Sequence, residues 1–165
     1  MSFAAARQEP FLQVEGLALD IGGRDGRFTG LIRALGADRV VMIDPAADEV
    51  RLGIEAGVIE ADAAFIGTVQ EWAHENPAAA NSAFVFNMQP HVALQHGFWD
   101  ALAASLRVGG LLVASCNEAT TSLTAWTAAA RLGCLEAVQF DTTFMPPPLP
   151  YAHFHASFFW RKTAA

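Results

Sequence analysis

Lysine is nearly absent from this sequence of 165 residues, and charge of any kind is scarce. Lys162 is the single lysine, charged residues make up 16% of the chain, and the formal net charge is −7. Much of the affinity for a nucleic acid comes from positive side chains that contact its phosphates. A chain this acidic gains little from such contacts, so we expect no nucleic-acid partner.

Cysteine, secretory signals and membrane-length hydrophobic runs are also lacking. Cys116 and Cys134 are too few for a disulfide scaffold and do not have the spacing of a zinc site. His91 and His96 lie in one segment and His153 and His155 in another, and a metal site would need a third or fourth ligand that converges with them in space, so we expect no metal site. The first ten residues hold no apolar signal region, and no run approaches a membrane span. We therefore expect a cytoplasmic protein without membrane attachment.

Hydrophobic residues are abundant, at 53% of the chain, and apolar runs alternate with helical patterns. Unbroken apolar runs are typical of parallel strands that are buried on both faces. Between two of them, from Phe28 to Leu35, apolar residues recur at the spacing of one helical face. The expected strands are Leu17–Ile21, Val40–Ile43, Val58–Ala61, Ser82–Phe86, Leu111–Ser115, Leu135–Phe144 and Phe154–Trp160.

The last two expected strands differ from the others because no helix separates them. Adjacent strands without a crossover connection run antiparallel. The sequence therefore predicts an α/β protein with a mostly parallel seven-stranded sheet and a C-terminal antiparallel hairpin. A chain of this length is most simply one domain over residues 1–165, with residues 1–16 as a short N-terminal extension.

A glycine-rich turn follows the first expected strand, and a carboxylate closes the second. The turn reads Ile21-Gly22-Gly23-Arg24-Asp25-Gly26, and Asp44 follows Ile43. Glycine lets the backbone approach a ligand closely. A carboxylate at the neighbouring strand tip can accept hydrogen bonds from both hydroxyls of a ribose. The order of these features predicts a βαβ unit that binds a nucleoside.

Two phosphate-binding signatures are missing from this unit. A dinucleotide site needs Gly-x-Gly-x-x-Gly, but the second and third glycine positions after Gly22 hold Arg24 and Arg27. Asp25 would also place a negative charge beside a pyrophosphate. No Gly-Lys-Ser or Gly-Lys-Thr occurs, which excludes a P-loop. An NAD-dependent oxidoreductase is therefore the least favoured of the three functions considered below.

The segment Asp20-x-Gly22-x-Arg24-x-Gly26 resembles the Asp-x-Gly-x-Gly-x-Gly loop of the class I S-adenosylmethionine-dependent methyltransferases. The resemblance extends from about Leu17 to Trp160 and includes the C-terminal hairpin. It implies a Rossmann-like three-layer sandwich and S-adenosylmethionine as the cofactor. It also implies methyl transfer to a small-molecule acceptor or to an acceptor bound to a carrier or protein.

The resemblance further implies roles for the residues that match the family pattern. Gly22, Gly23 and Gly26 would hold the methionine half of the cofactor. Asp44 would bind the ribose hydroxyls, and Asp62, after the third expected strand, would bind the adenine amino group. Both carboxylates have a simpler interpretation, because each precedes an expected helix that it could cap.

Three further positions complete the expected cofactor site. Asn87, after the fourth expected strand, would face the reacting methyl group. Arg24 replaces the middle glycine of the family loop, so its guanidinium would either pair with the cofactor's carboxylate, point away or block the pocket. Asp20 is expected to be buried and to accept hydrogen bonds from the amides of the glycine turn.

A general base is optional for methyl transfer, and histidine is the usual choice near neutral pH. His91 is the first candidate because it follows the strand that faces the methyl group, and His96 and His153 come after it. The alternative is a binding or scaffolding module that keeps this fold without its chemistry, as Arg24 and the lack of an obvious base would allow. Apolar surface next to the short N-terminal extension favours a homodimer.

Overall fold

The computed structural model describes residues 14–116, 119–145 and 153–164, with the side chains of 119–120, 140–145 and 153–156 left out. The strands are β1 (Leu17–Ile21), β2 (Arg39–Asp44), β3 (Ala64–Ile66), β4 (Ala80–Val85), β5 (Leu106–Cys116), β6 (Leu135–Met145) and β7 (His153–Lys162). The helices are α1 (Thr29–Ala34), α2 (Ala47–Glu55), the short 3₁₀ helix η1 (Ala61–Ala63), α3 (Val69–Glu75), α4 (Pro90–Ala93), α5 (Phe98–Ser105) and α6 (Ala119–Ala130).

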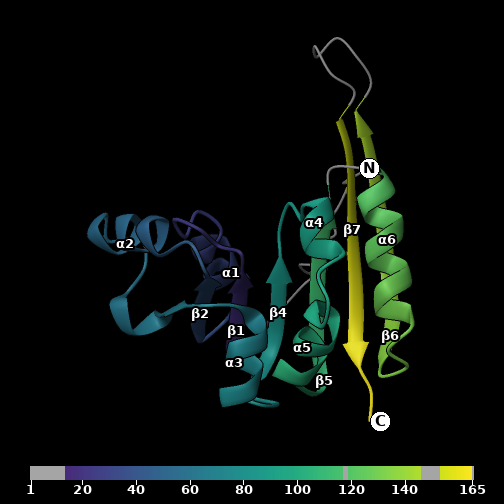
Figure 1. Ribbon diagram of the computed structural model, residues 1–165, viewed down its shortest axis with the longest axis horizontal. Helices are drawn as coiled ribbons and strands as arrows, with labels where there is room; N and C mark the ends of the chain where they lie inside the picture. The colour runs from purple at the N-terminus through teal and green to yellow at the C-terminus, as the bar shows by residue number, and fades with distance from the viewer. Residues whose placement is uncertain (1–13, 117–118, 146–152, 165) are drawn as a thin grey trace, which may run out of the picture.

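The seven strands form one sheet in the order β3-β2-β1-β4-β5-β7-β6 (Figure 1). The pairs among β1 to β5 are parallel, whereas β7 is antiparallel to both of its neighbours, β5 and β6. The predicted fold class is therefore confirmed: a mostly parallel seven-stranded α/β sheet with a C-terminal antiparallel hairpin. In Figure 1 the carboxyl ends of the parallel strands point upward.

Helices cover both faces of this sheet, which explains why its central strands are mostly apolar. In β1, Leu19 and Ile21 belong to a core with side chains of α3, α4, α5 and α6 on one face. Ala18 belongs to a second core with Ile32 of α1 on the other face. Because side chains alternate along a strand, both faces are buried, and a polar residue such as Asp20 is buried with them.

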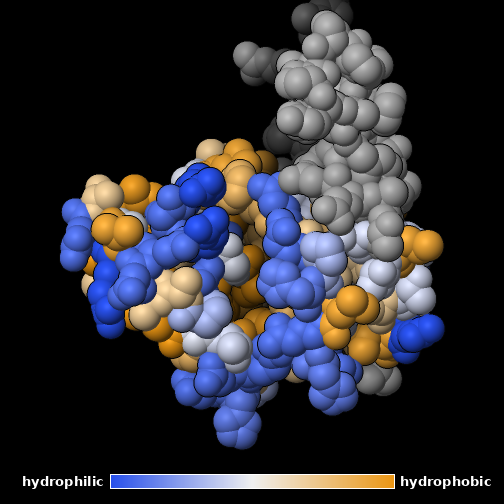
Figure 2. Space-filling model, turned by 45° about the horizontal axis from the view of Figure 1, so that its top comes forward, coloured by the Kyte–Doolittle hydropathy of each residue, from blue (hydrophilic) through white to orange (hydrophobic). Residues whose placement is uncertain are grey.

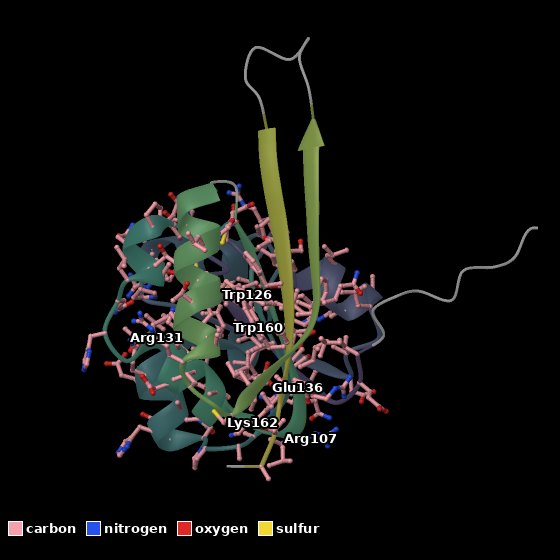
Figure 3. All side chains as sticks on the ribbon, turned by 90° about the vertical axis from the view of Figure 1, so that its right-hand side faces the viewer. Arg107, Trp126, Arg131, Glu136, Trp160 and Lys162 are labelled. Carbon is pink, nitrogen blue, oxygen red and sulfur yellow. The ribbon has the colours of Figure 1, made fainter. Side chains whose placement is uncertain are left out.

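An aromatic cluster fixes the C-terminal hairpin to the body of the protein. Trp160 of β7 is 1% exposed, and its ring lies 5.6 Å from Trp126 of α6 and 6.1 Å from Trp99 of α5. Phe158, two residues earlier on the same face, stacks on Trp160 with ring centroids 5.4 Å apart. Figure 3 shows Trp126 and Trp160 together where α6 crosses the hairpin. Buried aromatic side chains of this size are large contributors to core stability.

The third strand is where the sequence prediction was wrong. The strand lies at Ala64–Ile66, whereas the expected strand was Val58–Ala61. Ile59 of the expected segment is 2% exposed and packs with Met42 and Val50, so it holds α2 against the sheet. A short apolar run cannot by its pattern alone be assigned to a strand.

The helix expected directly after Asp62 also begins later. Phe65 lies in β3, and α3 begins only at Val69. Thr68 caps the helix: its hydroxyl accepts from the Glu71 amide, and the Glu71 side chain accepts from the Thr68 amide. This capping box reads Thr-x-x-Glu in the sequence and marks the true boundary.

The fifth strand also begins earlier than expected. The expected strand was Leu111–Ser115, but β5 runs from Leu106 to Cys116. Pairing with β4 shifts register between Leu106 and Leu111, and Gly109 has a φ of 81° there. Such an irregularity is a β-bulge, which glycine accommodates. Among the residues described, none of the helices has the length and hydrophobicity needed to cross a bilayer.

Candidate functional site

A cavity of about 290 Å³ opens at the carboxyl ends of β1 and β4. Figure 2, in which this edge of the sheet is turned toward the viewer, shows a hollow with hydrophobic atoms inside and hydrophilic residues around it. Ligands of open α/β sheets bind at this edge. The cavity is lined by Ile21, Gly22, Gly23, Arg24, Arg27, Phe28, Val85, Phe86, Asn87, Met88, Gln89 and Val92.

The glycine turn forms one wall of this cavity. Gly22 has a φ of +72°, and a Cβ built on it would meet no atom within 4 Å, so the backbone is open to a ligand. A Cβ on Gly23 would lie 2.5 Å from the Met42 Cγ and 2.9 Å from an Asp20 carboxylate oxygen. Gly26 closes the turn by donating its amide to the Gly23 carbonyl at 2.8 Å, and it is not part of the cavity lining.

Asp20 lies directly behind the turn and is 1% exposed. Its Oδ2 accepts a hydrogen bond from the Thr29 hydroxyl at 2.9 Å. The prediction that amides of the glycine turn donate to Asp20 was wrong, since the Gly22 amide donates to the Ile43 carbonyl instead. Burial raises the pKa of Asp20 to about 6; the Thr29 hydrogen bond opposes this rise, and the nearby Asp44 adds to it.

Asp44 is at the tip of β2, as expected, but both of its oxygens are engaged by the protein's own backbone. Oδ2 accepts from the Arg24 amide at 2.9 Å, and Oδ1 accepts from the Ala46 amide at 2.7 Å. The second bond spans two residues and closes a turn before α2, whose N-cap is Ala46 and has no side-chain capping bond, so Asp44 does not cap the helix itself. With both bonds in place Asp44 is 4% exposed.

The Arg24 side chain reaches toward α2. Its Nη2 donates to Glu49 Oε1 at 2.6 Å and its Nε donates to the other carboxylate oxygen of Glu49. This bidentate bond lowers the pKa of Glu49. The Arg24 backbone has a φ of 52°, a left-handed conformation that few residues other than glycine adopt. Of the alternatives for this arginine, the structure shows a side chain that is paired within the protein.

Asp62 is the one expected cofactor residue that lies at the wrong edge of the sheet. It belongs to η1, which precedes β3, so it is near the amino end of that strand. There it lines a separate cavity with Arg39, whose Nη2 donates to the Asp62 carbonyl at 3.2 Å. The adenine role inferred for Asp62 required a strand that ended before it, and that strand does not exist.

The loop after β4 forms the opposite wall of the cavity. Asn87 is exposed, lines the cavity and has a φ of 52°. Its amide donates to Ser115 Oγ at 3.1 Å, and the next amide, of Met88, donates to the Ser115 carbonyl at 2.8 Å. Ser115, at the end of β5, therefore positions this loop. No pattern in the sequence indicates that role, because it depends on the pairing of β4 with β5.

Two aromatic residues that the sequence analysis did not select complete the wall. Phe28, before α1, and Phe86, after β4, both line the cavity, and their ring centroids are 4.9 Å apart. Both were assigned to core stripes of a helix and a strand. Their rings are tilted by 43° to each other at the strand ends, and they give the cavity an apolar aromatic wall.

Neither of the two candidate histidines with described side chains, His91 and His96, lines this cavity. His91, in α4, is exposed and is not one of the lining residues. His96 lines a different groove, between α5 and α6. His153 is the first residue of β7, and its side chain lies outside the described part. Within the described residues, histidine, cysteine, aspartate and glutamate form no group of three or more that could hold a metal ion.

Solved structures share this fold at low sequence identity. The 16S rRNA (adenine(1408)-N(1))-methyltransferase from Catenulisporales acidiphilia has a TM-score of 0.65 and 13% identity, covering 90% of this chain and 88% of its own. A variant of that enzyme solved with its cosubstrate SAM has a TM-score of 0.64 and 14% identity, covering 90% and 85%. An antibiotic-related methyltransferase has a TM-score of 0.66 and 10% identity, covering 88% and 87%.

These likenesses define the fold. Neither a protein-family model nor a curated protein matches the sequence. The strand order and the structural matches together show that the chain has the fold of the class I S-adenosylmethionine-dependent methyltransferases. The resemblance found in the glycine turn and the C-terminal hairpin is thereby confirmed at the level of fold.

Proposed function

We propose that the protein binds S-adenosylmethionine in the cavity between the glycine turn and the loop after β4, and transfers its methyl group to an acceptor. The observation that carries this proposal is the open backbone of Gly22 at the carboxyl edge of a sheet with the methyltransferase strand order. The 16S rRNA methyltransferase solved with SAM has the same fold, which adds support.

The charged residues of the cavity lining are Arg24 and Arg27, and each is paired with a carboxylate, Glu49 and Asp25. These pairs do not select a ligand by charge. The glycine spacing of a dinucleotide site is missing from the turn, and the antiparallel β7 departs from the usual dinucleotide-binding sheet. Both points disfavour the NAD alternative.

The residues present fit the cofactor at two places. The Gly22–Gly23 backbone leaves room for the methionine part, and the ring pair Phe28–Phe86 offers an apolar aromatic wall. Asp44 can meet the ribose only where its oxygens have spare lone pairs, because two amides already engage them. The Arg24 segment covers Asp44, and it would have to move to expose that carboxylate.

When bound, the cofactor supplies an electrophilic methyl group on sulfur. An acceptor would take this methyl group by in-line attack of a lone pair on the methyl carbon, and the electron pair of the broken carbon–sulfur bond would leave the sulfur neutral. The protein contributes by holding the two partners in line, which supplies roughly 7–11 kcal/mol in favourable cases. Asn87 stands at the mouth of the cavity, where its side-chain amide can orient an acceptor. For acceptors that must lose a proton, His91 remains the predicted general base.

The acceptor class that we propose is a small molecule, free or attached to a carrier or protein. The acidic chain disfavours a nucleic acid. The second candidate function is a binding module without methyl transfer, and the covered Asp44 favours it, because a ribose would compete with two backbone amides.

Calorimetric titration distinguishes a methyltransferase from a binding module. We expect S-adenosylmethionine and S-adenosylhomocysteine to bind with one site per chain and NAD not to bind. Binding of both adenosyl compounds without product on any acceptor tested would favour the binding module. No binding of either compound at millimolar concentration would contradict the proposal as a whole.

A further inference from the structure

A second cavity, of about 160 Å³, opens at the opposite edge of the sheet, near the amino ends of β1, β4 and β5. It shares no lining residue with the glycine-turn cavity. Its polar side chains come from four segments: Glu15 before β1, Asn81 and Ser82 of β4, Arg107 of β5 and Arg161 of β7. Residues so far apart in sequence are brought together only by the strand order.

The buried hydroxyl of Ser82 lacks a partner in this cavity wall. Ser82 is 2% exposed, and its Oγ makes no hydrogen bond. Buried hydroxyl groups in folded proteins are nearly always paired with protein or with an ordered polar group. A hydroxyl left in this state at a cavity lined by cations is a donor that a bound oxyanion would satisfy.

Asn81 supplies a second donor with a fixed orientation. Its Oδ1 accepts from the Leu17 amide at 3.3 Å, which leaves Nδ2 as the donating atom. The amide group occupies the space where Gly16 has no Cβ, since a Cβ there would lie 2.5 Å from Nδ2. The side chain is therefore held in place before any ligand arrives.

Two guanidinium groups add positive charge at the cavity. Arg161 donates through Nη1 to the Gly109 carbonyl at 3.3 Å, and its other N–H groups are left to bind elsewhere. Arg107 is exposed and has no ion pair among the residues described. Guanidinium groups match the planar edge of an oxyanion with two parallel hydrogen bonds.

One carboxylate in the cavity lining, that of Glu15, only partly offsets the two arginines. Around the cavity the charges are mixed. Lys162 donates through Nζ to the Leu106 carbonyl at 2.6 Å, Glu136 is the register partner of Arg161 on β6, and the Asp38 carboxylate accepts from the Gly16 amide at 2.7 Å. Figure 3 shows Arg107, Glu136 and Lys162 at the end of the sheet away from the projecting tip of the hairpin. The lining itself is cationic, in a chain whose net charge is −7.

We propose that this cavity is a binding site for a phosphate group, held by the Ser82 hydroxyl, the Asn81 amide and the guanidinium groups of Arg107 and Arg161. The site is independent of methyl transfer, because it lies at the other edge of the sheet and uses none of the same residues. It serves either free phosphate or the phosphate group of a small metabolite.

Titration of the full chain with inorganic phosphate at constant ionic strength tests this site. We expect saturable binding that weakens at least about tenfold in Arg107→Gln, which removes one charge-assisted contact. Arg131→Gln, which removes the same charge from the groove between α5 and α6, is the control and should leave phosphate binding unchanged. Glu15→Gln should strengthen binding, because it removes a carboxylate from the cavity lining.

Ser82→Ala tests the buried hydroxyl itself. We expect it to weaken phosphate binding while the unfolding midpoint without phosphate stays the same or rises, because the lost group has no partner to lose. A parallel titration with glycerol 3-phosphate shows the source: tighter binding than inorganic phosphate indicates a metabolite, and weaker binding indicates the free ion. Absence of saturable binding by both, or equal weakening in Arg107→Gln and Arg131→Gln, would overturn the proposal.

Discussion

Replacing Asp20 with asparagine should stabilise the protein, although it removes an ionisable side chain from behind the glycine turn. Asp20 is 1% exposed, and burial raises its pKa from 3.8 to about 6. A change of this size in the folded state corresponds to about 3 kcal/mol between the two protonation states. Asparagine has a similar shape, and its Oδ1 can still accept the hydrogen bond of the Thr29 hydroxyl.

The gain should depend on pH in a defined direction. A carboxyl group whose folded pKa is raised binds its proton more tightly when folded, so ionisation favours the unfolded chain. Below pH 3.8 the carboxyl group is protonated in both states, and Asp20→Asn should change stability little. Between pH 3.8 and about 6 the wild-type protein loses this stability, and above pH 6 the variant should be more stable by about 3 kcal/mol.

Urea unfolding at pH 4, 5.5, 7 and 8 measures this difference. Asp100→Asn, at an exposed position of α5, is the matched control and should shift stability by no more than about 1 kcal/mol. Destabilisation by Asp20→Asn at pH 7, or an equal gain at pH 4 and pH 7, would refute the reasoning. The first result would mean that the carboxylate has stronger partners than Thr29.

Three further predictions concern the glycine turn, the Arg24–Glu49 pair beside it and the boundary of α3. Gly22→Ala should weaken binding of S-adenosylhomocysteine at least about tenfold and destabilise the fold by about 1–2 kcal/mol. Gly57 has a similar φ of +70° and equally open space but lies away from the cavity, so Gly57→Ala should cost similar stability and leave binding unchanged. Equal losses of binding in the two variants would contradict this. Glu49→Gln should strengthen binding severalfold in calorimetry because it releases the Arg24 segment from α2, and weaker binding would mean that the pair builds the site. Thr68→Ala should lower the free energy of unfolding by about 1 kcal/mol through loss of the capping box, and no change in the urea midpoint would show the cap to be dispensable.

The sheet could be predicted because its signals are local and agree with one another. Apolar runs buried on both faces mark β1, β2 and β4, and the absence of a crossover helix marks the hairpin of β6 and β7. β3 was predicted in the wrong place because Ile59 is apolar and packs beneath α2. An apolar pattern of four residues does not distinguish such a buried loop residue from a strand.

The site was predictable only in its backbone. Gly22 and Asp44 follow from the order of strand, turn and strand, and both lie at the expected edge. The partners of Asp44 did not follow, since they depend on the left-handed backbone of Arg24. Phe28 and Phe86 were missed because an aromatic side chain at a strand end has the same pattern as one in the core.

A crystal structure with S-adenosylhomocysteine bound is the most direct test of the central claim. The account predicts the ligand between Gly22 and Asn87, with its homocysteine part against the glycine turn and the Arg24 segment moved off Asp44. An empty cavity at saturating ligand, with the Arg24 amide still bonded to Asp44, would contradict it.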